Sequence, residues 1–451
     1  MTRGRDPARV FQVLLRHPAI QALVAVAREV GSVECHLVGG VLRDRFLGLA
    51  GRDLDAVVSD RGPEIASRLA ERLSARLVHL GGKAFGAYRL LGESVGRPWV
   101  LDLWDREGTS LAQDLARRDF TVDSIALAVP GGELIDPHGG LADLRTRVLR
   151  ATGPESFTGD PLRVLRLPRL LVQLPGFTAE PATLALARAA APGLTGVASE
   201  RVRDELALLF RQPDVARGIA VAGALEVYPG LWLGRPGEPA PETAPGQDTL
   251  GRLCHELGRL GWAAQTLREL AGGALDLPVD HRLARVALTF VSLPAGVGRA
   301  ATLERVAEAG YLTVKDRKAV ARLLPWTRLP ADPLHRRRFL HRLGELWPTV
   351  ACFAGVRSES RGETADWGAA VRALIRLHRR EGEALAHPPQ LLDGREVGEI
   401  LGVAPGPEIG KALETLRWAQ VDGEVTTKHQ ARRLVSALRQ DHEEVSGSGL
   451  T

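Results

Sequence analysis

Residues 37–58 read LVGGVLRDRFLGLAGRDLDAVV, and this stretch decides which kind of fold the chain adopts. An apolar run ends at the pair Gly39 and Gly40, and helical apolar spacing follows from Val41. The chain then enters a β-rich run in which Asp53 and Asp55 are separated by one residue. Because residues i and i+2 of a strand project from the same face, the stretch predicts a strand, a helix and a second strand that carries two adjacent carboxylates.

Two carboxylates this close repel each other unless a cation lies between them. A divalent metal held by such a pair activates a hydroxyl group and neutralises a triphosphate; a solvated strand edge or a turn is the simpler alternative for an isolated D-x-D. Gly39 and Gly40 open a helix, where backbone N–H groups approach phosphate oxygens. Arg43 is placed to reach a phosphate or to pair with Asp44. The stretch is neither a Walker A motif nor a dinucleotide-binding fingerprint, since G-K-[ST] and G-x-G-x-x-G are missing.

β-rich runs continue beyond this stretch and alternate with helical segments up to about residue 150. The runs are VECHLVGG, DLDAVVS, ARLVHL, AYRLLG, WVLDLW, IALAV and ELIDP. They predict a small α+β head with a mixed sheet. From about residue 155, strand patterns largely give way to amphipathic helices that continue to about residue 439. The Pro/Gly/Ala-rich segment 235–247 is predicted to be a surface loop or linker.

The composition is typical of a soluble globular protein, with 451 residues of which 45% are hydrophobic and 25% charged. No apolar run is long enough to span a membrane, and the first residues lack the apolar core of a signal peptide. The three cysteines form no metal-spaced pair and are typical of buried residues in a reducing compartment. We therefore expect a cytoplasmic protein without a membrane partner. The net charge of +5 is compatible with a polyanionic partner.

Taken together, the motifs resemble those of the class II tRNA nucleotidyltransferase and bacterial poly(A) polymerase family, which belongs to the polymerase-β-type nucleotidyltransferases. LVGGVLRDRFLG followed by RDLDAVV is similar to the family's first motif, and further matches follow in the family's order. They are DLARRDFTVDSIAL (114–127), DPHGGLADLRTRVLR (136–150), DPLRVLRLPR (160–169) and SERVRDEL (199–206), with LLDGREVGEILGVAPGPEIGKAL near the C-terminus. Any one of these matches can arise by chance, but the first five, up to residue 206, in the same order argue strongly against chance.

The resemblance implies an α+β nucleotidyltransferase head of the polymerase-β type with a small mixed sheet, followed by an extended all-α neck, body and tail. The expected parts are an N-terminal helical extension (1–29), the head (30–153), a neck with the nucleotide-reading helix (154–215), a body (216–345), a tRNA-binding tail (346–440) and a disordered end (441–451). Basic stretches at 335–342 and 372–380 are candidate RNA-binding faces, although each is explained equally well as solvated helix surface.

The same resemblance implies which residues form the site. Asp53 and Asp55 would hold Mg²⁺, which activates the RNA 3′-hydroxyl. Asp102 in VLDLW is the candidate third catalytic carboxylate. The alternative, to which we give equal weight, is a solvated aspartate at the end of a strand. Arg118 would clamp the nucleotide phosphates, and Asp119 would accept a hydrogen bond from a ribose hydroxyl. The implied nucleotide-binding set is Gly39, Gly40, Arg43, Arg118, Asp119, Asp160, Arg163, Arg166 and Arg169.

Asp160 and Arg163 are the pair that would read the base. A carboxylate accepts from an exocyclic amine and a guanidinium donates to the adjacent ring nitrogen or carbonyl. Cytosine offers these groups in that order, adenine does so after a modest rotation, and uracil and guanine present the reverse order. Asp160 before Pro161 is also a good helix N-cap, and the two roles are compatible. Arg166 and Arg169 continue the row and complete the nucleotide site by resemblance.

Three positions depart from the family's usual pattern. Asp123 stands where the family usually has Asn, Gly159 stands where it usually has Glu, and Pro168 interrupts the backbone hydrogen bonding of the reading helix. We expect an added negative charge near the nucleotide from Asp123. A kink at Pro168 is able to displace Arg169.

The spacing of the motifs also bears on nucleotide choice. Family members that add the terminal A carry a flexible loop between the strand of the third carboxylate and the R-R-D motif, and here that interval is only residues 104–116. The shortening resembles the CC-adding branch. We therefore predict a template-independent enzyme that adds CC from CTP to the 3′ acceptor end of tRNA, with ATP left open as a further substrate. The alternatives are a complete CCA-adding enzyme, a poly(A) polymerase or, in a different class, a catalytically inactive RNA-binding protein.

Overall fold

The structure is a computed structural model that describes residues 12–49, 53–80, 87–94, 97–106, 109–227, 247–272, 277–291 and 299–447. The chain divides into two units, Met1–Ala244 and Pro245–Thr451, and each is described by itself. The predicted linker 235–247 lies outside the described residues except for its last residue, with which a helix begins.

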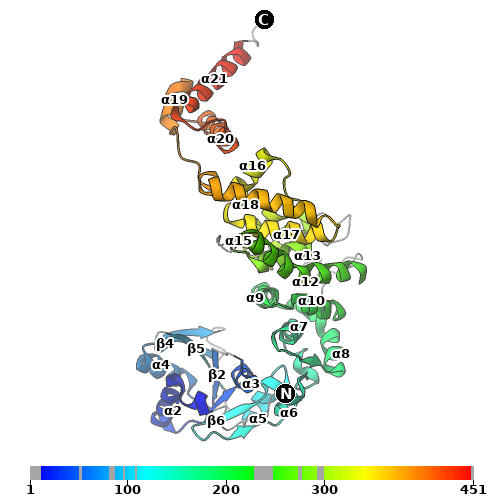
Figure 1. Cartoon of the computed structure of the whole chain (residues 1–451). Helices are drawn as coiled ribbons and strands as arrows, with labels where there is room; N and C mark the ends of the chain where they lie inside the picture. The colour runs from blue at the N-terminus through cyan, green and yellow to red at the C-terminus, as the bar shows by residue number, and fades with distance from the viewer. Residues whose placement is uncertain are drawn as a thin grey trace. The chain divides into compact units, whose positions relative to one another are not determined.

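Seven strands form one mixed sheet in the first unit, in the order β3-β4-β5-β2-β1-β6-β7 (Figure 1). β2 and β5 run parallel, and the other neighbouring pairs are antiparallel. Each of the seven β-rich runs of the sequence forms one strand, so the predicted mixed sheet is confirmed. The strands are β1 (Cys35–Val38), β2 (Asp53–Val58), β3 (Arg76–Leu80), β4 (Ala87–Ser94), β5 (Arg97–Asp105), β6 (Ala126–Val129) and β7 (Leu134–Ile135).

Helices α2 (Pro18–Gly31) and α4 (Gly62–Leu73) pack on each other and on one face of the sheet. Leu54, Leu90 and Leu101 lie side by side across three strands on this face and are almost fully buried. Their alternation with polar residues is the pattern of a sheet with one buried face. Because α2 contributes to this core, it is part of the head rather than a separate N-terminal extension.

The opposite face of the sheet is covered over β1, β2 and β6. A small buried cluster there joins Val38, Val57 and Ala126 of these strands to Leu115 of α5 (Leu111–Ala116). Helix α3 (Gly40–Leu47) follows β1 directly and also contacts β2. A further helix of the head, α6 (Gly140–Thr146), packs against the turn of 3₁₀ helix η1 (Thr121–Asp123).

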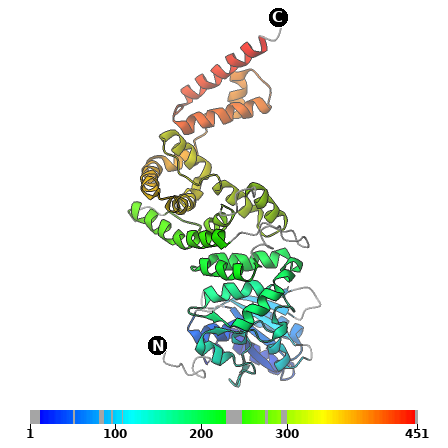
Figure 2. The same ribbon diagram turned by 90° about the vertical axis from the view of Figure 1, so that its right-hand side faces the viewer.

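Four helices, which we call the neck, follow the sheet in the first unit and are drawn in blue-green to green in both views (Figure 1 and Figure 2). They are α7 (Arg163–Gln173), α8 (Pro181–Ala190), α9 (Ser199–Arg211) and α10 (Val215–Ala224), and α7 contacts each of the other three. Two short parallel strands, β8 (Val148–Leu149) and β9 (Thr178–Ala179), form a second sheet that the sequence pattern did not predict.

The second unit is helical throughout its described residues. Its helices are α12 (Gln247–Leu270), α13 (His281–Val291), α14 (Arg299–Glu308), α15 (Val314–Leu323), α16 (Pro333–Leu343), α17 (Trp347–Glu359), α18 (Thr364–Ala386), α19 (Gly394–Leu401), α20 (Pro407–Asp422) and α21 (Lys428–Gly447). The last three enclose their own apolar cluster. α21 continues through residues 441–447, which we expected to be disordered, and residues 448–451 lie outside the described residues. No described helix has both the length and the apolar character needed to cross a membrane.

Candidate active site

A row of charged side chains crosses the middle of the sheet. Asp55 on β2 lies opposite Asp102 on β5, and Asp102 lies opposite Arg89 on β4. Asp53 lies two residues before Asp55, opposite Val100. Because opposite residues of neighbouring strands project from the same face, as do residues i and i+2, the three predicted carboxylates share one face. We call the face of β2, β5, β4 and β3 that carries these four charged residues the site face.

Asp102 is neutralised by an arginine that the sequence analysis did not single out. Arg89 donates from Nε to Oδ1 of Asp102 at 2.8 Å and from Nη2 to Oδ2 at 2.7 Å. Such a two-pronged, charge-assisted contact is among the stronger side-chain interactions. Asp53 is exposed, and neither it nor Asp55 has an ion-pair partner among the described residues. The negative charge of the row is therefore concentrated on Asp53 and Asp55.

The pKa of the Asp55 carboxyl group reflects this concentration of negative charge. Burial raises the pKa of Asp55 to about 6, and the neighbouring charges of Asp102, Asp123 and Asp53 act in the same direction, while Arg118 opposes the shift. Burial and nearby negative charges oppose ionisation of this carboxyl group, and a bound cation would stabilise its ionised form. The pKa of Asp55 thus indicates a position where a cation would bind.

The described residues contain no ready-made group of three or more His, Cys, Asp or Glu side chains that would enclose a metal. Mg²⁺ in nucleotide sites is commonly held by one or two carboxylates together with substrate phosphates, so such a group is not required. Asp53 and Asp55 fit this requirement, because both supply oxygen ligands and neither is neutralised. Asp102 fits less well in this structure, since both of its oxygens are bonded to Arg89.

Gly39, Gly40 and Arg118 form a cradle beside Asp55. Gly39 has φ +74°, in the left-handed region where a side chain is strained. A Cβ built on Gly39 would lie 2.9 Å from Nη1 of Arg118 and 3.5 Å from Oδ2 of Asp55, so the glycine leaves room for the guanidinium. Arg118 bonds Asp114 through Nη2 at 3.2 Å, and its buried Nε has no hydrogen-bond partner. With Gly40 at the start of α3, this geometry offers donors for an anionic ligand.

Arg43 is placed differently from the expected phosphate contact. Its buried guanidinium donates from Nε to Asp44 at 2.8 Å and from Nη1 to Oδ1 of Asp123 at 2.6 Å. The expected extra charge of Asp123 is therefore countered by Arg43 inside the head. The second oxygen of Asp123, Oδ2, is buried without a partner, and burial raises the pKa of this carboxyl.

Asp119 and Arg166 join the head to α7, the helix predicted to read the nucleotide. Nε of Arg166 donates to Oδ2 of Asp119 at 2.6 Å, and Asp119 is only 5% exposed. Burial opposes ionisation of Asp119, but the positive charge of Arg166 and its hydrogen bond keep the pKa of Asp119 below its usual value. This contact brings the R-R-D motif and α7 together. It also means that Asp119 already has a cationic partner.

The pair predicted to read the base, Asp160 and Arg163, lies at the start of α7. The helix begins at Arg163, and Asp160 precedes it in a turn closed by the bond from the Arg163 N–H to the Asp160 carbonyl. Oδ1 of Asp160 accepts from the Leu162 N–H at 3.3 Å, so the capping role falls on the turn before the helix. Oδ2 accepts from Nη2 of Arg201 in α9 at 2.8 Å, and Nη1 of Arg163 donates to the Ser156 carbonyl at 2.9 Å. The predicted pair is adjacent, but each member has a protein partner.

Arg169 lies inside the neck. α7 continues through Pro168, and Arg169 is 7% exposed and bonded to Glu205 of α9 and Gln173. Arg169 therefore stabilises the packing of α7 on α9, and the structure does not place it beside Asp160 and Arg163 at the start of the helix.

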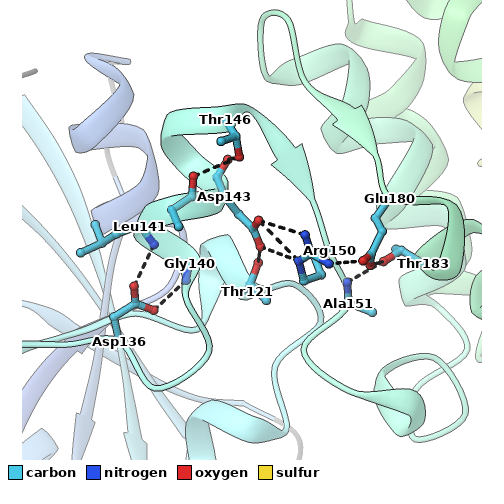
Figure 3. Close-up of polar contacts among 11 residues, drawn as sticks. Thr121, Asp136, Gly140, Leu141, Asp143, Thr146, Arg150, Ala151, Glu180 and Thr183 are labelled. Atoms are coloured by element: carbon cyan, nitrogen blue, oxygen red, sulfur yellow. Dashed lines mark hydrogen bonds and ion pairs between the residues drawn. The ribbon is translucent and has the colours of Figure 1, made fainter. Parts of the chain in front are cut away.

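The motif at 136–150 connects the head to the neck (Figure 3). Asp136 accepts from the Gly140 and Leu141 N–H groups at 2.7 and 2.9 Å and so caps α6. Asp143 accepts from the Thr121 hydroxyl at 2.7 Å and from Nε of Arg150 at 3.1 Å. Arg150 also pairs with Glu180, and the Ala151 N–H donates to Thr183 at 2.8 Å. This network links the R-R-D-F-T motif to the start of α8.

Sequence reasoning missed Arg89, Arg201 and Glu205. Arg201 and Glu205 lie in SERVRDEL, which was noted only as a motif, and both bond a predicted site residue. The alternation of AYRLLG places Arg89 on one face of a strand, but which carboxylate it meets depends on a strand register that the sequence does not reveal.

Comparisons with known proteins settle the family. The chain is 34% identical over 438 residues to the A-adding tRNA nucleotidyltransferase of Deinococcus radiodurans, covering 88% of this chain and 94% of that protein. It is 31% identical over 436 residues to the CC-adding tRNA nucleotidyltransferase of Geobacter sulfurreducens, covering 92% and 95%. The chain belongs to the tRNA nucleotidyltransferase family. Family models agree, since the poly A polymerase head domain matches residues 101–150 and the "Probable RNA and SrmB- binding site of polymerase A" matches residues 176–228.

Solved structures show the same fold as this tRNA nucleotidyltransferase. A complex of a CCA-adding enzyme with ATP has a TM-score of 0.65 at 21% identity, covering 96% of this chain and 98% of that one. The Thermotoga maritima CCA-adding enzyme complexed with tRNA has a TM-score of 0.61 at 21% identity, covering 96% and 99%. The expected order of a polymerase-type head followed by helices is thereby confirmed.

In one of the two predicted RNA-binding faces of the tRNA nucleotidyltransferase, most arginines contact other residues of the protein. In the stretch 335–342, Arg338 bonds Asp422 at 2.9 and 2.6 Å and Arg337 donates to the Val421 carbonyl at 2.6 Å. Arg342 lies over the ring of Trp418 at 5.2 Å. These cations fix α16 to α20, so they join the tail to the body.

Proposed function

We propose that this tRNA nucleotidyltransferase adds CC from CTP to the tRNA 3′ end, with Mg²⁺ held by Asp53 and Asp55. The observation that carries the proposal is the site face, where two carboxylates without a cationic partner lie beside the Gly39–Arg118 cradle. The contact between Asp119 and Arg166 links this cradle to α7, which begins at Arg163 just after Asp160. One site therefore combines groups suited to a metal, a triphosphate and a base.

The protein residues have separate tasks in this proposal. Mg²⁺, when bound, lowers the pKa of the attacking 3′-hydroxyl and neutralises the triphosphate. Arg118, whose Nη1 lies beside Gly39, donates to a phosphate oxygen, and the N–H groups at the start of α3 bind further oxygens. Arg43 acts indirectly, because its contacts with Asp44 and Asp123 fix the start of α3 against the R-R-D-F-T motif.

Base choice rests on Asp160 and Arg163. Arg201 holds one oxygen of Asp160, and a carboxylate oxygen has lone pairs left for a cytosine amine. Arg163 uses Nη1 for the Ser156 carbonyl and retains other N–H groups for the adjacent ring nitrogen and carbonyl. Uracil would face Asp160 with a carbonyl oxygen, and the two acceptors would repel each other. Arg166 supports this site by fixing α7 to the head.

The limit to CC is supported by the short connection between β5 and α5. β5 ends at Asp105 and α5 begins at Leu111, so only residues 106–110 join the strand of Asp102 to the helix before the R-R-D motif. The resemblance implies that A-adding members have a longer, flexible loop there. The relatives include A-adding and CC-adding enzymes, so their names do not decide between the two activities.

An extension assay tests the proposal. Purified protein is incubated with Mg²⁺, CTP and ATP and with tRNA that ends at the discriminator base or in CC. We expect two cytidylates on the first tRNA and no addition to the second. A product ending in CCA would show a complete CCA-adding enzyme, addition of A to the second tRNA alone would show an A-adding enzyme, and long A-tails would show a poly(A) polymerase.

A variant series distinguishes an inactive protein from an inactive assay. Asp53→Asn is expected to abolish incorporation, whereas Glu93→Gln, which changes an exposed carboxylate on the same strand as Arg89, is expected to leave it unchanged. Binding of labelled tRNA by a wild-type protein that incorporates nothing would favour the RNA-binding alternative.

A further inference from the structure

The site face extends beyond the carboxylate row over β5, β4 and β3. The registers place Trp104 opposite Ala87 and Ala87 opposite Leu80, one step from the row of Asp102, Arg89 and Val78. On the other side of this row lie Val100, Leu91 and Arg76. The apolar side chains among these are mostly only half-buried, whereas Leu54, Leu90 and Leu101 on the opposite face are almost fully buried. The site face over these three strands is therefore open.

Trp104 is the most exposed aromatic side chain on this face. It is 41% exposed and is the one exposed Phe, Tyr or Trp among the residues that the structure describes. An isolated apolar residue at a surface needs no explanation. Trp104, however, lies in a strand with an unbroken register, between the buried Ala87 and Val57 of the neighbouring strands and on the same face as the carboxylates.

The position of Trp104 relative to the carboxylates follows from the strands. It lies two residues after Asp102, which is about 7 Å along a strand, and opposite Val57, two residues after Asp55. The Gly39–Arg118 cradle lies on the other side of Asp55, toward β1. If the triphosphate occupies that cradle, the β5 side of the row is left for the second substrate, the RNA that supplies the attacking hydroxyl.

We propose that the ring of Trp104 stacks on the base of the 3′-terminal nucleotide of the acceptor tRNA and so positions its hydroxyl beside Asp53 and Asp55. Stacking suits this task, because every base has a flat face and the enzyme must accept acceptor ends that differ in sequence. Asp160 and Arg163 read the edge of the incoming nucleotide, whereas Trp104 holds the acceptor without reading its edge. The inference rests on the proposed use of tRNA as acceptor, and it adds a positioning residue to that site.

The test compares Trp104→Phe, which keeps a ring, with Trp104→Leu, which keeps only apolar bulk. We expect Trp104→Leu to raise KM for tRNA about 10-fold, within the range that one base–aromatic stack contributes, with KM for CTP changed less than 2-fold. Trp104→Phe should restore most of the lost affinity. Unchanged circular dichroism and thermal unfolding of both variants show that the head remains folded.

A second acceptor makes the test specific to stacking. With a tRNA whose 3′-terminal nucleotide lacks its base, wild type and Trp104→Leu should have the same KM, because the stacking partner is absent from both. Equal KM values for Trp104→Leu and Trp104→Phe on intact tRNA would overturn the inference, as would an undiminished effect on the abasic acceptor. Since wild type is measured in parallel, failure of the proposed function itself would appear as absence of wild-type incorporation, which is a separate result.

Discussion

The site face and the contact between head and neck differ in whether their carboxylates are paired with arginines. In the neck and at its contact with the head, the buried carboxylates that we described are paired with arginines, as in Asp119–Arg166, Asp143–Arg150 and Glu205–Arg169. On the site face, Asp53 and Asp55 lie beside further carboxylates, and burial together with those charges raises the pKa of Asp55 to about 6. Paired charges fix one region to another, whereas unpaired like charges are tolerated where a ligand will supply the opposite charge.

The largest expected effect comes from removing the unpaired charge. Asp55→Asn keeps the size of the side chain but loses a metal ligand, and we expect a fall in kcat/KM of about 10³-fold, equivalent to roughly 4 kcal/mol. Its stability should stay equal to that of the wild type or rise, because a repelled charge has been removed. Steady-state CTP incorporation and urea unfolding measure the two effects. A loss of stability together with activity would instead place Asp55 among the structural charges.

Removing one partner of a buried ion pair should have the reverse effect: a large loss of stability and a smaller loss of activity. Arg169→Met leaves Glu205 without its guanidinium between α7 and α9, and we expect the free energy of unfolding to fall by about 3 kcal/mol. Incorporation at a temperature where the variant is folded should fall much less than in Asp55→Asn. The matched control is the double variant Arg169→Met/Glu205→Leu, which should recover part of the stability. A variant with full stability and no activity would show that Arg169 contacts the nucleotide.

The raised pKa of Asp55 predicts a pH dependence of stability in metal-free protein. The unfolded value is near 3.9, so the folded state binds the proton more tightly, and this contribution to stability is present below pH 4 and lost as the pH rises through about 6. Asp55→Asn does not titrate, so its stability relative to wild type should increase by roughly 2 kcal/mol as the pH rises from 4 to 7. Urea unfolding in EDTA measures this difference. A difference that shrinks over this range would contradict the electrostatics of the row.

The smallest effect is expected at the edge of the row. Arg89 is 43% exposed, so its pair with Asp102 should contribute no more than about 1 kcal/mol to stability. Arg89→Met would release Asp102 as an additional oxygen ligand, and we expect the Mg²⁺ concentration for half-maximal activity to fall several-fold. Arg76→Met is the matched control, because Arg76 lies exposed on the same face with two strands between it and the strand of Asp53 and Asp55. Equal shifts in both variants would show that only the overall charge of the face matters.

The sequence was sufficient for the strands because their alternation is local. Each predicted run, such as WVLDLW, became a strand of the sheet, and the same-face position of Asp53 and Asp55 follows from their spacing alone. Register is not local, which is why the pairing of Asp102 with Arg89 could not be predicted. The short strands β8 and β9 were missed for the same reason, since they pair with each other and nothing local in either segment indicates that partner.

The partners of Arg43 and Arg169 could not be predicted from the sequence either. Arg43 and Arg169 were expected at the nucleotide because their motifs suggested it, and the structure buries both against carboxylates far along the chain, Asp123 and Glu205. A motif gives the residue type at a position but not the partner that packing brings to it. The start of α7 also shifted, because Asp160 caps a turn and the helix begins only at Arg163.

Metal binding itself tests the contrast between paired and unpaired carboxylates most directly. Mn²⁺ bound to the full-length protein in the presence of CTP is counted by electron paramagnetic resonance for wild type, Asp55→Asn and Asp143→Asn. We predict that Asp55→Asn loses the bound ion and that Asp143→Asn, whose carboxylate is paired with Arg150, retains it. Equal Mn²⁺ binding by wild type and Asp55→Asn would contradict the assignment of the site.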